Sequence, residues 1–203
     1  MNIKAIIFDY GNVLSIPQTQ EDINKMVELL NVEEEKFHDS YYKYRDLYDG
    51  GAVNGVGYWD LVSKALDRNL DYKTLEYLAK FDLDSWYNQN QDMWSLVKKL
   101  KENYKTALLS NNLHELVIRM EKDLDLNKHF DVITFSYKLG IVKPDPRIYE
   151  HCLKDLNLEP QETIFIDDRK NNIQTANNLG INGIIFENYS QLLNDLKRFD
   201  LFF

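Results

Sequence analysis

The chain of 203 residues is long enough for one sizeable core with an inserted unit, and its 44% hydrophobic and 28% charged residues are ordinary for a globular protein. The net charge of −9 and the lack of a basic stripe argue against nucleic acid and anionic membranes as partners. A lone cysteine, Cys152, excludes a disulfide framework, and no apolar run approaches the roughly 20 residues of a membrane span, so we expect a cytoplasmic protein.

The first predicted strand ends at an acid. Ala5–Ile6–Ile7–Phe8 is a short apolar run typical of a buried strand, and Asp9 follows it directly. Gly11 and Asn12 then favour a turn. Open α/β sheets place their chemistry at the carboxyl ends of buried strands, so Asp9 is a candidate catalytic residue. The alternative for this stretch alone is that Asp9 only stabilises the turn.

Residues 16–88 contain no convincing strand. They carry apolar residues at helical spacing in four stretches, at 23–30, 37–48, 58–66 and 75–81. Four glycines between residues 50 and 57 predict a turn or flexible loop there. The segment is therefore predicted to be an all-helical insert, with flexible joints near Ser15–Pro17 and Tyr87–Gln91. Its aromatic residues are expected to form core first and substrate pocket second.

From about residue 90 strands and helices alternate. The further predicted strands are residues 104–109, 132–135, 163–166 and 183–186. Helices are predicted between them, one of them beginning at Pro144 and another ending at Gly180. Five strands alternating with helices predict an α/β fold, a Rossmann-like, doubly wound parallel sheet built from residues 1–15 and 89–203, with the helical cap domain at 16–88.

Polar groups follow four of these strands or their loops, and they match a known family. The motifs are Phe8–Asp9–Tyr10–Gly11–Asn12–Val13, Leu108–Leu109–Ser110–Asn111–Asn112, Gly140–Ile141–Val142–Lys143–Pro144–Asp145, and Phe165–Ile166–Asp167–Asp168–Arg169–Lys170–Asn171–Asn172. In this order and spacing the sequence resembles the haloacid dehalogenase superfamily, whose members are mostly phosphatases, and the insert resembles the cap of that family. Taken singly, each motif is also compatible with a helix cap or a solvated charge.

The chemistry of these residues agrees with the resemblance. Asp9 can attack phosphorus without a separate base and form an aspartyl-phosphate. Mg²⁺ suits oxygen ligands, and the expected set is Asp9, the backbone carbonyl of Gly11, and Asp168, with Asp167 binding directly or through water. For the phosphoryl oxygens we expect the Ser110 hydroxyl, the Asn111 backbone amide and the positive charge of Lys143.

Other polar residues are given no catalytic role. Arg169 is expected to be structural or at the substrate rim. Asn172 is expected on a helix surface or bridging a loop, although similar proteins use this position to orient the preceding acids. The four histidines show no ligand spacing and are assigned no metal.

Gly11 departs from the family pattern. Most phosphatases that the chain resembles carry a second aspartate there, which protonates the leaving oxygen. A subgroup with an Asp-x-Gly-Asn-Val motif, which resembles glucose-1-phosphate-type sugar phosphatases, is the nearest match. The missing acid is expected to narrow the substrates to esters whose leaving group needs little protonation.

Two other functions remain open. A 2-haloacid dehalogenase needs no such acid, but the Asp167–Asp168 pair argues against it. A weakly active protein that binds a phosphorylated ligand is disfavoured because Asp9, Ser110, Lys143 and Asp168 are all present together. The sequence therefore favours a Mg²⁺-dependent phosphatase of a small phosphorylated metabolite, as a monomer or homodimer.

Overall fold

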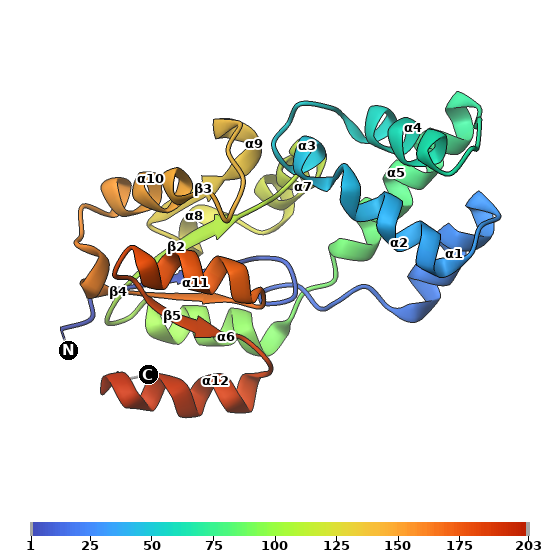
Figure 1. Ribbon diagram of the computed structural model, residues 1–203. Helices are drawn as coiled ribbons and strands as arrows, with labels where there is room; N and C mark the ends of the chain where they lie inside the picture. Colours follow the sequence, from blue (N-terminus) through green and yellow to red (C-terminus); the bar gives the residue numbers. More distant parts are fainter. Residues whose placement is uncertain (1, 202–203) are drawn as a thin grey trace.

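The computed structural model describes residues 2–201, and its centre is a five-stranded parallel sheet in the order β3-β2-β1-β4-β5 (Figure 1). The strands are β1 (Ala5–Phe8), β2 (Lys105–Ser110), β3 (Val132–Phe135), β4 (Thr163–Asp167) and β5 (Asn182–Ile185). The first strand is the central one, since Ala5 pairs with Lys105 on one side and with Thr163 on the other. The predicted fold class, an α/β parallel sheet, is confirmed.

Helices make up most of the rest of the described chain. Five lie between β1 and the next core element: α1 (Gln20–Leu30), α2 (Glu34–Lys43), α3 (Arg45–Asp49), α4 (Gly55–Ala65) and α5 (Tyr72–Trp86). The others are α6 (Gln91–Leu100), α7 (His114–Asp123), α8 (Leu126–His129), α9 (Ser136–Leu139), α10 (Pro146–Leu156), α11 (Lys170–Asn178) and α12 (Tyr189–Leu196), with 3₁₀ turns at Pro160–Glu162 and Lys197–Phe199. Among residues 2–201, none of the helices has the length and apolar character needed to cross a membrane.

Helices cover both faces of the sheet. Successive side chains of a strand point to opposite faces, so Ala5 and Ile7 pack with α10 and α11, while Ile6 and Phe8 pack with α6 and α12. Because both faces are buried, the strands read as continuous apolar runs rather than alternating ones. At the carboxyl edge of the sheet, β2 ends in Ser110, β4 ends in Asp167, and Asp9 directly follows β1.

The predicted strands 104–109 and 183–186 are each displaced by one residue, and two helix starts are wrong because of side-chain caps. Helix α4 begins at Gly55, inside the stretch predicted as a loop, because the Asn54 side chain accepts a hydrogen bond from the backbone N–H of Gly57 at 2.9 Å. Helix α10 begins at Pro146 rather than Pro144, because Asp145 takes the N-cap position. Proline fits the first helical turn in either case, so the sequence pattern could not separate the two prolines.

The segment containing α1–α5, which we call the insert, lies beside the carboxyl ends of the strands (Figure 1). Its two connections to the core run side by side. Ser15 and Gln89 form an antiparallel bridge, and the backbone N–H of Ile16 donates to the carbonyl of Asn88 at 2.8 Å. The two connections of the insert therefore pair with each other close to the end of β1.

Candidate active site

The polar residues predicted at the strand ends meet at one place. Asp9 follows β1, Ser110 ends β2, and Asp167 ends β4. Lys143 comes from the loop between α9 and α10. A cavity of about 230 Å³ opens here, and its core lining includes Asp9, Gly11, Asn111, Lys143 and Asp168. Ser110 and Asp167 lie behind this lining and are buried.

Asp9 is held by one of its two carboxylate oxygens. Its Oδ1 accepts hydrogen bonds from the backbone N–H of Tyr10 at 2.7 Å and from the Ser110 hydroxyl at 2.7 Å, and it lies 2.8 Å from Lys143 Nζ. Its Oδ2 accepts no hydrogen bond from residues 2–201 and faces the cavity. Burial raises the pKa of Asp9 to about 7, against the opposing effect of the Lys143 ammonium. One oxygen is therefore fixed and the other is available.

Lys143 joins two buried acids. Its Nζ lies 2.7 Å from Asp167 Oδ2 as well as 2.8 Å from Asp9 Oδ1. Burial alone would lower the pKa of Lys143, but the carboxylates of Asp167 and Asp9 outweigh it and raise that pKa above its ordinary value. The ammonium is thus kept charged in a position between the two acids.

Asp167 is saturated by donors. Besides Lys143, it accepts from Asn172 Nδ2 at 3.0 Å on each oxygen and from the backbone N–H of Arg169 at 2.8 Å. Asn172 is buried, with only 1% of its surface exposed, so the predicted helix-surface position for this residue is wrong. Its contact with Asp167 across the loop after β4 agrees with the other expectations, a loop-bridging residue or one that orients the preceding acids. Asn172 thus fixes the carboxylate of Asp167 against Lys143.

Asn111 holds the loop that carries Lys143. Its Oδ1 accepts from the backbone N–H of Lys143 at 2.7 Å, and its Nδ2 donates to the backbone carbonyl of Lys143 at 2.9 Å. This two-point contact joins the end of β2 to the lysine loop. The sequence indicated only the backbone amide of Asn111, so the role of its side chain in positioning Lys143 was missed.

Three acids form a cluster with the donor chemistry of a magnesium site. Asp9, Asp167 and Asp168 each offer a carboxylate oxygen, and these atoms lie within 4.8 Å of one another. Asn12 Nδ2 orients Asp168 through a 2.8 Å hydrogen bond to Oδ2. Burial, together with the charge of Asp167, raises the pKa of Asp168. The three carboxylates carry more negative charge than the single ammonium of Lys143 can offset. A divalent cation that prefers oxygen ligands would balance this charge and suits these side chains.

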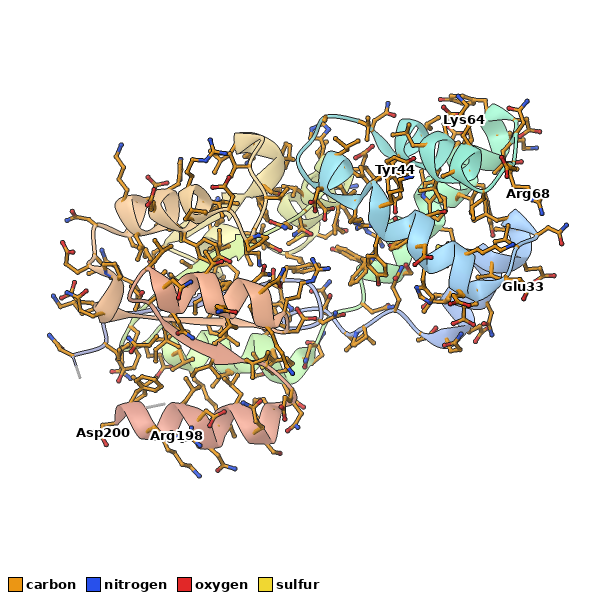
Figure 2. All side chains as sticks on the ribbon, viewed as in Figure 1. Glu33, Tyr44, Lys64, Arg68, Arg198 and Asp200 are labelled. Atoms are coloured by element: carbon orange, nitrogen blue, oxygen red, sulfur yellow. The ribbon has the colours of Figure 1, made fainter. Side chains whose placement is uncertain are left out.

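The insert supplies the other wall of the cavity. Tyr42 comes from α2, Arg45 and Asp49 from α3, and Trp86 from α5. In Figure 2 the labelled side chains of Glu33, Lys64 and Arg68 lie at the end of the insert remote from the sheet, and they are not part of this cavity. The cavity is thus closed by the parts of α2, α3 and α5 nearest to β1.

A buried polar network fixes these insert residues. Arg45 donates from Nε to Asp49 Oδ1 at 3.1 Å, and from Nη1 to Asp82 Oδ2 at 3.1 Å and to the hydroxyl of Tyr41 at 2.7 Å. Tyr41 in turn donates to Asp82 Oδ1 at 2.6 Å and accepts from Trp86 Nε1 at 3.0 Å. The sequence predicted no site role for Arg45, Asp49 or Asp82, and for the aromatic residues a substrate pocket was only the second expectation after the core. Their i,i+4 and aromatic spacing is shared by any solvated or core-facing helix, so no signal separated them.

With this geometry in view, comparison with known proteins identifies the family. A model of the haloacid dehalogenase-like hydrolases matches residues 3–180. The chain belongs to this family. The resemblance seen in the four motifs is therefore confirmed at family level, and the chain is a hydrolase-family enzyme.

The named relatives differ in how much of their own length this chain matches. D-ribitol-5-phosphate phosphatase of Bacteroides thetaiotaomicron is 25% identical over 188 residues, covering 88% of this chain and 89% of that protein. Acyl-CoA dehydrogenase family member 10 of Mus musculus is 42% identical over 93 residues, but these cover 45% of this chain and only 8% of that protein. The chain matches 8–18% of the length of several such larger relatives.

Solved structures support the fold. The magnesium complex of a haloacid dehalogenase family enzyme, BT-2542 from Bacteroides thetaiotaomicron, superposes with a TM-score of 0.77 at 23% identity, covering 95% of this chain and 99% of that one. At this identity the similarity concerns the fold. It extends over both the sheet and the insert.

Proposed function

We propose that this protein is a Mg²⁺-dependent phosphatase that hydrolyses a small phosphorylated metabolite through an aspartyl-phosphate on Asp9. The observation that carries the proposal is the state of Asp9. Its Oδ1 is fixed by three donors, while its Oδ2 is free of hydrogen bonds from the described residues and faces the cavity. A nucleophile needs this combination of fixed orientation and one available oxygen.

The neighbouring residues supply charge and orientation. Lys143, held between Asp9 and Asp167, offsets negative charge as phosphorus is attacked. The Ser110 hydroxyl, which donates to Asp9 in the free protein, and the backbone amide of Asn111 are the donors we assign to the phosphoryl oxygens. Phosphoryl transfer depends mainly on such positioning and charge neutralisation.

The magnesium ion would be held by Asp9, the backbone carbonyl of Gly11, and Asp168. Asp167 already accepts from Lys143, Asn172 and Arg169, so it would act through water rather than directly. When bound, the ion neutralises the phosphoryl group and the clustered acids. Asn12, through its hydrogen bond to Asp168, keeps that ligand aimed at the site.

The insert would act as a cap domain of residues 16–88 over a core of residues 1–15 and 89–203. Cap closure excludes water and completes the cavity, and the paired connections at Ser15 and Gln89 are the natural hinge. A cavity of about 230 Å³ limits the substrate to a small molecule.

A sugar or sugar-alcohol phosphate is the substrate class best supported. One of the relatives that span nearly the whole chain is named a D-ribitol-5-phosphate phosphatase, another is named a sesquiterpene phosphatase, and a relative covering 46% of the chain is named a phosphorylated carbohydrates phosphatase. The Asp-x-Gly-Asn-Val motif, read at Asp9–Val13, points to the same class through its resemblance to sugar phosphatases.

A substrate screen tests the proposal. Phosphorylated metabolites, including ribitol 5-phosphate and glucose 1-phosphate, are offered to the protein with Mg²⁺ and with excess EDTA. We expect phosphate release only with the metal and none from the Asp9→Asn variant. Release of chloride from 2-chloropropionate, with no phosphate release from any ester, would overturn the proposal in favour of a dehalogenase.

A further inference from the structure

Departure of an alcohol from a phosphate ester needs a proton, and the core side of the cavity offers no evident donor. Asp9 is the proposed nucleophile, Asp168 is held by Asn12 beside the metal cluster, and Lys143 is salt-bridged to two acids. The remaining core side chains of the lining are amides, a leucine, a tyrosine and a guanidinium. Position 11, next to the nucleophile, is a glycine with no side chain at all.

The insert does place a carboxyl group on this cavity. Asp49 ends α3 and lines the same cavity as Asp9, Lys143 and Asp168. Only 7% of its surface is exposed. Its Oδ1 accepts from Arg45 Nε at 3.1 Å, whereas its Oδ2 accepts no hydrogen bond from residues 2–201. Like Asp9, it has one oxygen fixed and one oxygen available.

Backbone contacts fix Asp49 relative to the core. The carbonyl of Asp49 accepts a hydrogen bond from the hydroxyl of Ser136, and the same hydroxyl accepts from the backbone N–H of Asn112 at 3.0 Å. Asn112 lies two residues after the end of β2 and also lines the cavity. The position of Asp49 is therefore set by the part of the core that carries Ser110 and Asn111.

We propose that Asp49 is the general acid and base of the reaction, supplied by the insert in place of a side chain at position 11. The inference rests on the proposed phosphatase function. In the first step the Asp9 oxygen bonds to phosphorus, the bond from phosphorus to the leaving oxygen breaks, and Asp49 gives its proton to that oxygen. In the second step water attacks phosphorus, its proton goes to Asp49, and the bond from phosphorus to Asp9 breaks. The sum is ester plus water giving alcohol plus phosphate, with Asp9 and Asp49 restored.

The surroundings of Asp49 suit this exchange. Burial raises its pKa to about 6, against the opposing charge of Arg45, while Asp82 and Asp46 add to the rise. The core residues with charges that line the same cavity are Asp9, Lys143, Asp168 and Arg169. Lys138 belongs to α9, which contacts α3, and Glu115 of α7 accepts a hydrogen bond from the backbone N–H of Gly55. A group that titrates near neutral pH can both give and take a proton within one turnover.

Gly11 provides an internal control. Its φ lies outside the left-handed region, and a Cβ built there meets only Trp86 Cζ3, at an ordinary contact distance of 3.8 Å. An aspartate side chain can therefore be introduced next to the nucleophile. If Asp49 is the proton donor, Gly11→Asp should restore activity to an Asp49→Asn protein.

The experiment compares an alkyl phosphate, the one hydrolysed fastest in the screen above, with 4-nitrophenyl phosphate, whose leaving group needs no proton. We expect Asp49→Asn to lower kcat for the alkyl phosphate by about 10²–10⁴-fold. The same variant should release one equivalent of nitrophenolate per site in a burst at the wild-type rate and then turn over slowly. Gly11→Asp in the Asp49→Asn protein should recover the alkyl phosphate activity. Asp39→Asn, which removes an exposed acid of α2 that is not among the charges acting on Asp49, should behave as wild type.

Three results would overturn the inference. The first is that Asp49→Asn hydrolyses the alkyl phosphate at the wild-type rate. The second is that Asp49→Asn lowers the burst rate with 4-nitrophenyl phosphate as much as it lowers kcat for the alkyl phosphate. The third is that adding Gly11→Asp to the Asp49→Asn protein does not recover alkyl phosphate hydrolysis. If Asp49→Asn does not fold, a steep dependence of the wild-type phosphorylation rate on leaving-group pKa would overturn it, because an enzyme with a proton donor shows a flat one. A failure of the proposed phosphatase function is distinguishable from these results. In that case the wild-type protein itself would release no phosphate that depends on Mg²⁺ and on Asp9.

Discussion

Asp49→Asn should make the protein more stable at neutral pH. In the wild-type protein the pKa of Asp49 rises from 3.8 to about 6 because the carboxyl group is buried. Such a group binds more protons in the folded chain than in the unfolded chain between these values. The free energy of unfolding therefore falls as pH rises from about 4 to about 6, and the loss persists above this range.

The size of the effect follows from the same pKa. A rise from 3.8 to about 6 corresponds to about 3 kcal/mol at about 1.4 kcal/mol per pH unit. Asparagine is nearly the same shape, keeps an oxygen for Arg45 and carries no charge at any pH. The variant should thus gain up to about 3 kcal/mol over wild type at about pH 8, which is roughly 6–12 °C in Tm for a chain of this length.

The assay is urea unfolding of both proteins, without Mg²⁺, at several values between about pH 4 and pH 8. The difference in unfolding free energy should be smallest at the acid end and reach its plateau above about pH 6. Asp39→Asn, which removes an exposed acid of α2, serves as the control and should show no such trend. A difference between Asp49→Asn and wild type that does not change with pH would refute the reasoning about burial of this carboxyl group.

Three further predictions concern the core. Asp9→Asn should abolish phosphate release while leaving the circular dichroism spectrum unchanged, and a folded variant with full activity would remove the nucleophile assignment. Asp168→Ala should weaken Mg²⁺ binding in calorimetry and lose the rise in Tm that Mg²⁺ gives to wild type, which follows from mass action; an unchanged metal affinity would place the ion elsewhere. Lys143→Ala should lower the free energy of unfolding by about 3–5 kcal/mol in urea without Mg²⁺, because Asp9 and Asp167 are left buried without their cation. A loss below about 1 kcal/mol would show that water or relaxation replaces the lysine charge.

The strands and the core residues of the candidate site could be predicted from the sequence because the same local pattern indicates both. An apolar run that ends in a polar group marks a buried strand and its functional edge together, as at Phe8–Asp9 and Ile166–Asp167. The parallel arrangement then brings the ends of β1, β2 and β4 to one edge, and Lys143 is within salt-bridge distance of acids from two of them.

The insert side of the cavity was not predictable in the same way. Arg45 and Asp49 have the spacing of an ordinary surface ion pair on a helix, and only the folded insert brings Arg45 to within 3.1 Å of the buried Asp82 of α5. Asn172 likewise reads as a polar helix residue, and its burial depends on the position of Asp167 in space. Side chains whose role depends on contacts between distant segments leave no local pattern.

The most direct test of the central claim is to trap the phosphorylated enzyme. The wild-type protein is mixed with Mg²⁺ and its best substrate, quenched in acid within one turnover, and digested for mass spectrometry. We expect the added mass of one phosphoryl group on the peptide containing Asp9, and none in the Asp9→Asn protein. A phosphoryl group on another residue, or full turnover with no phosphorylated peptide at any quench time, would contradict it.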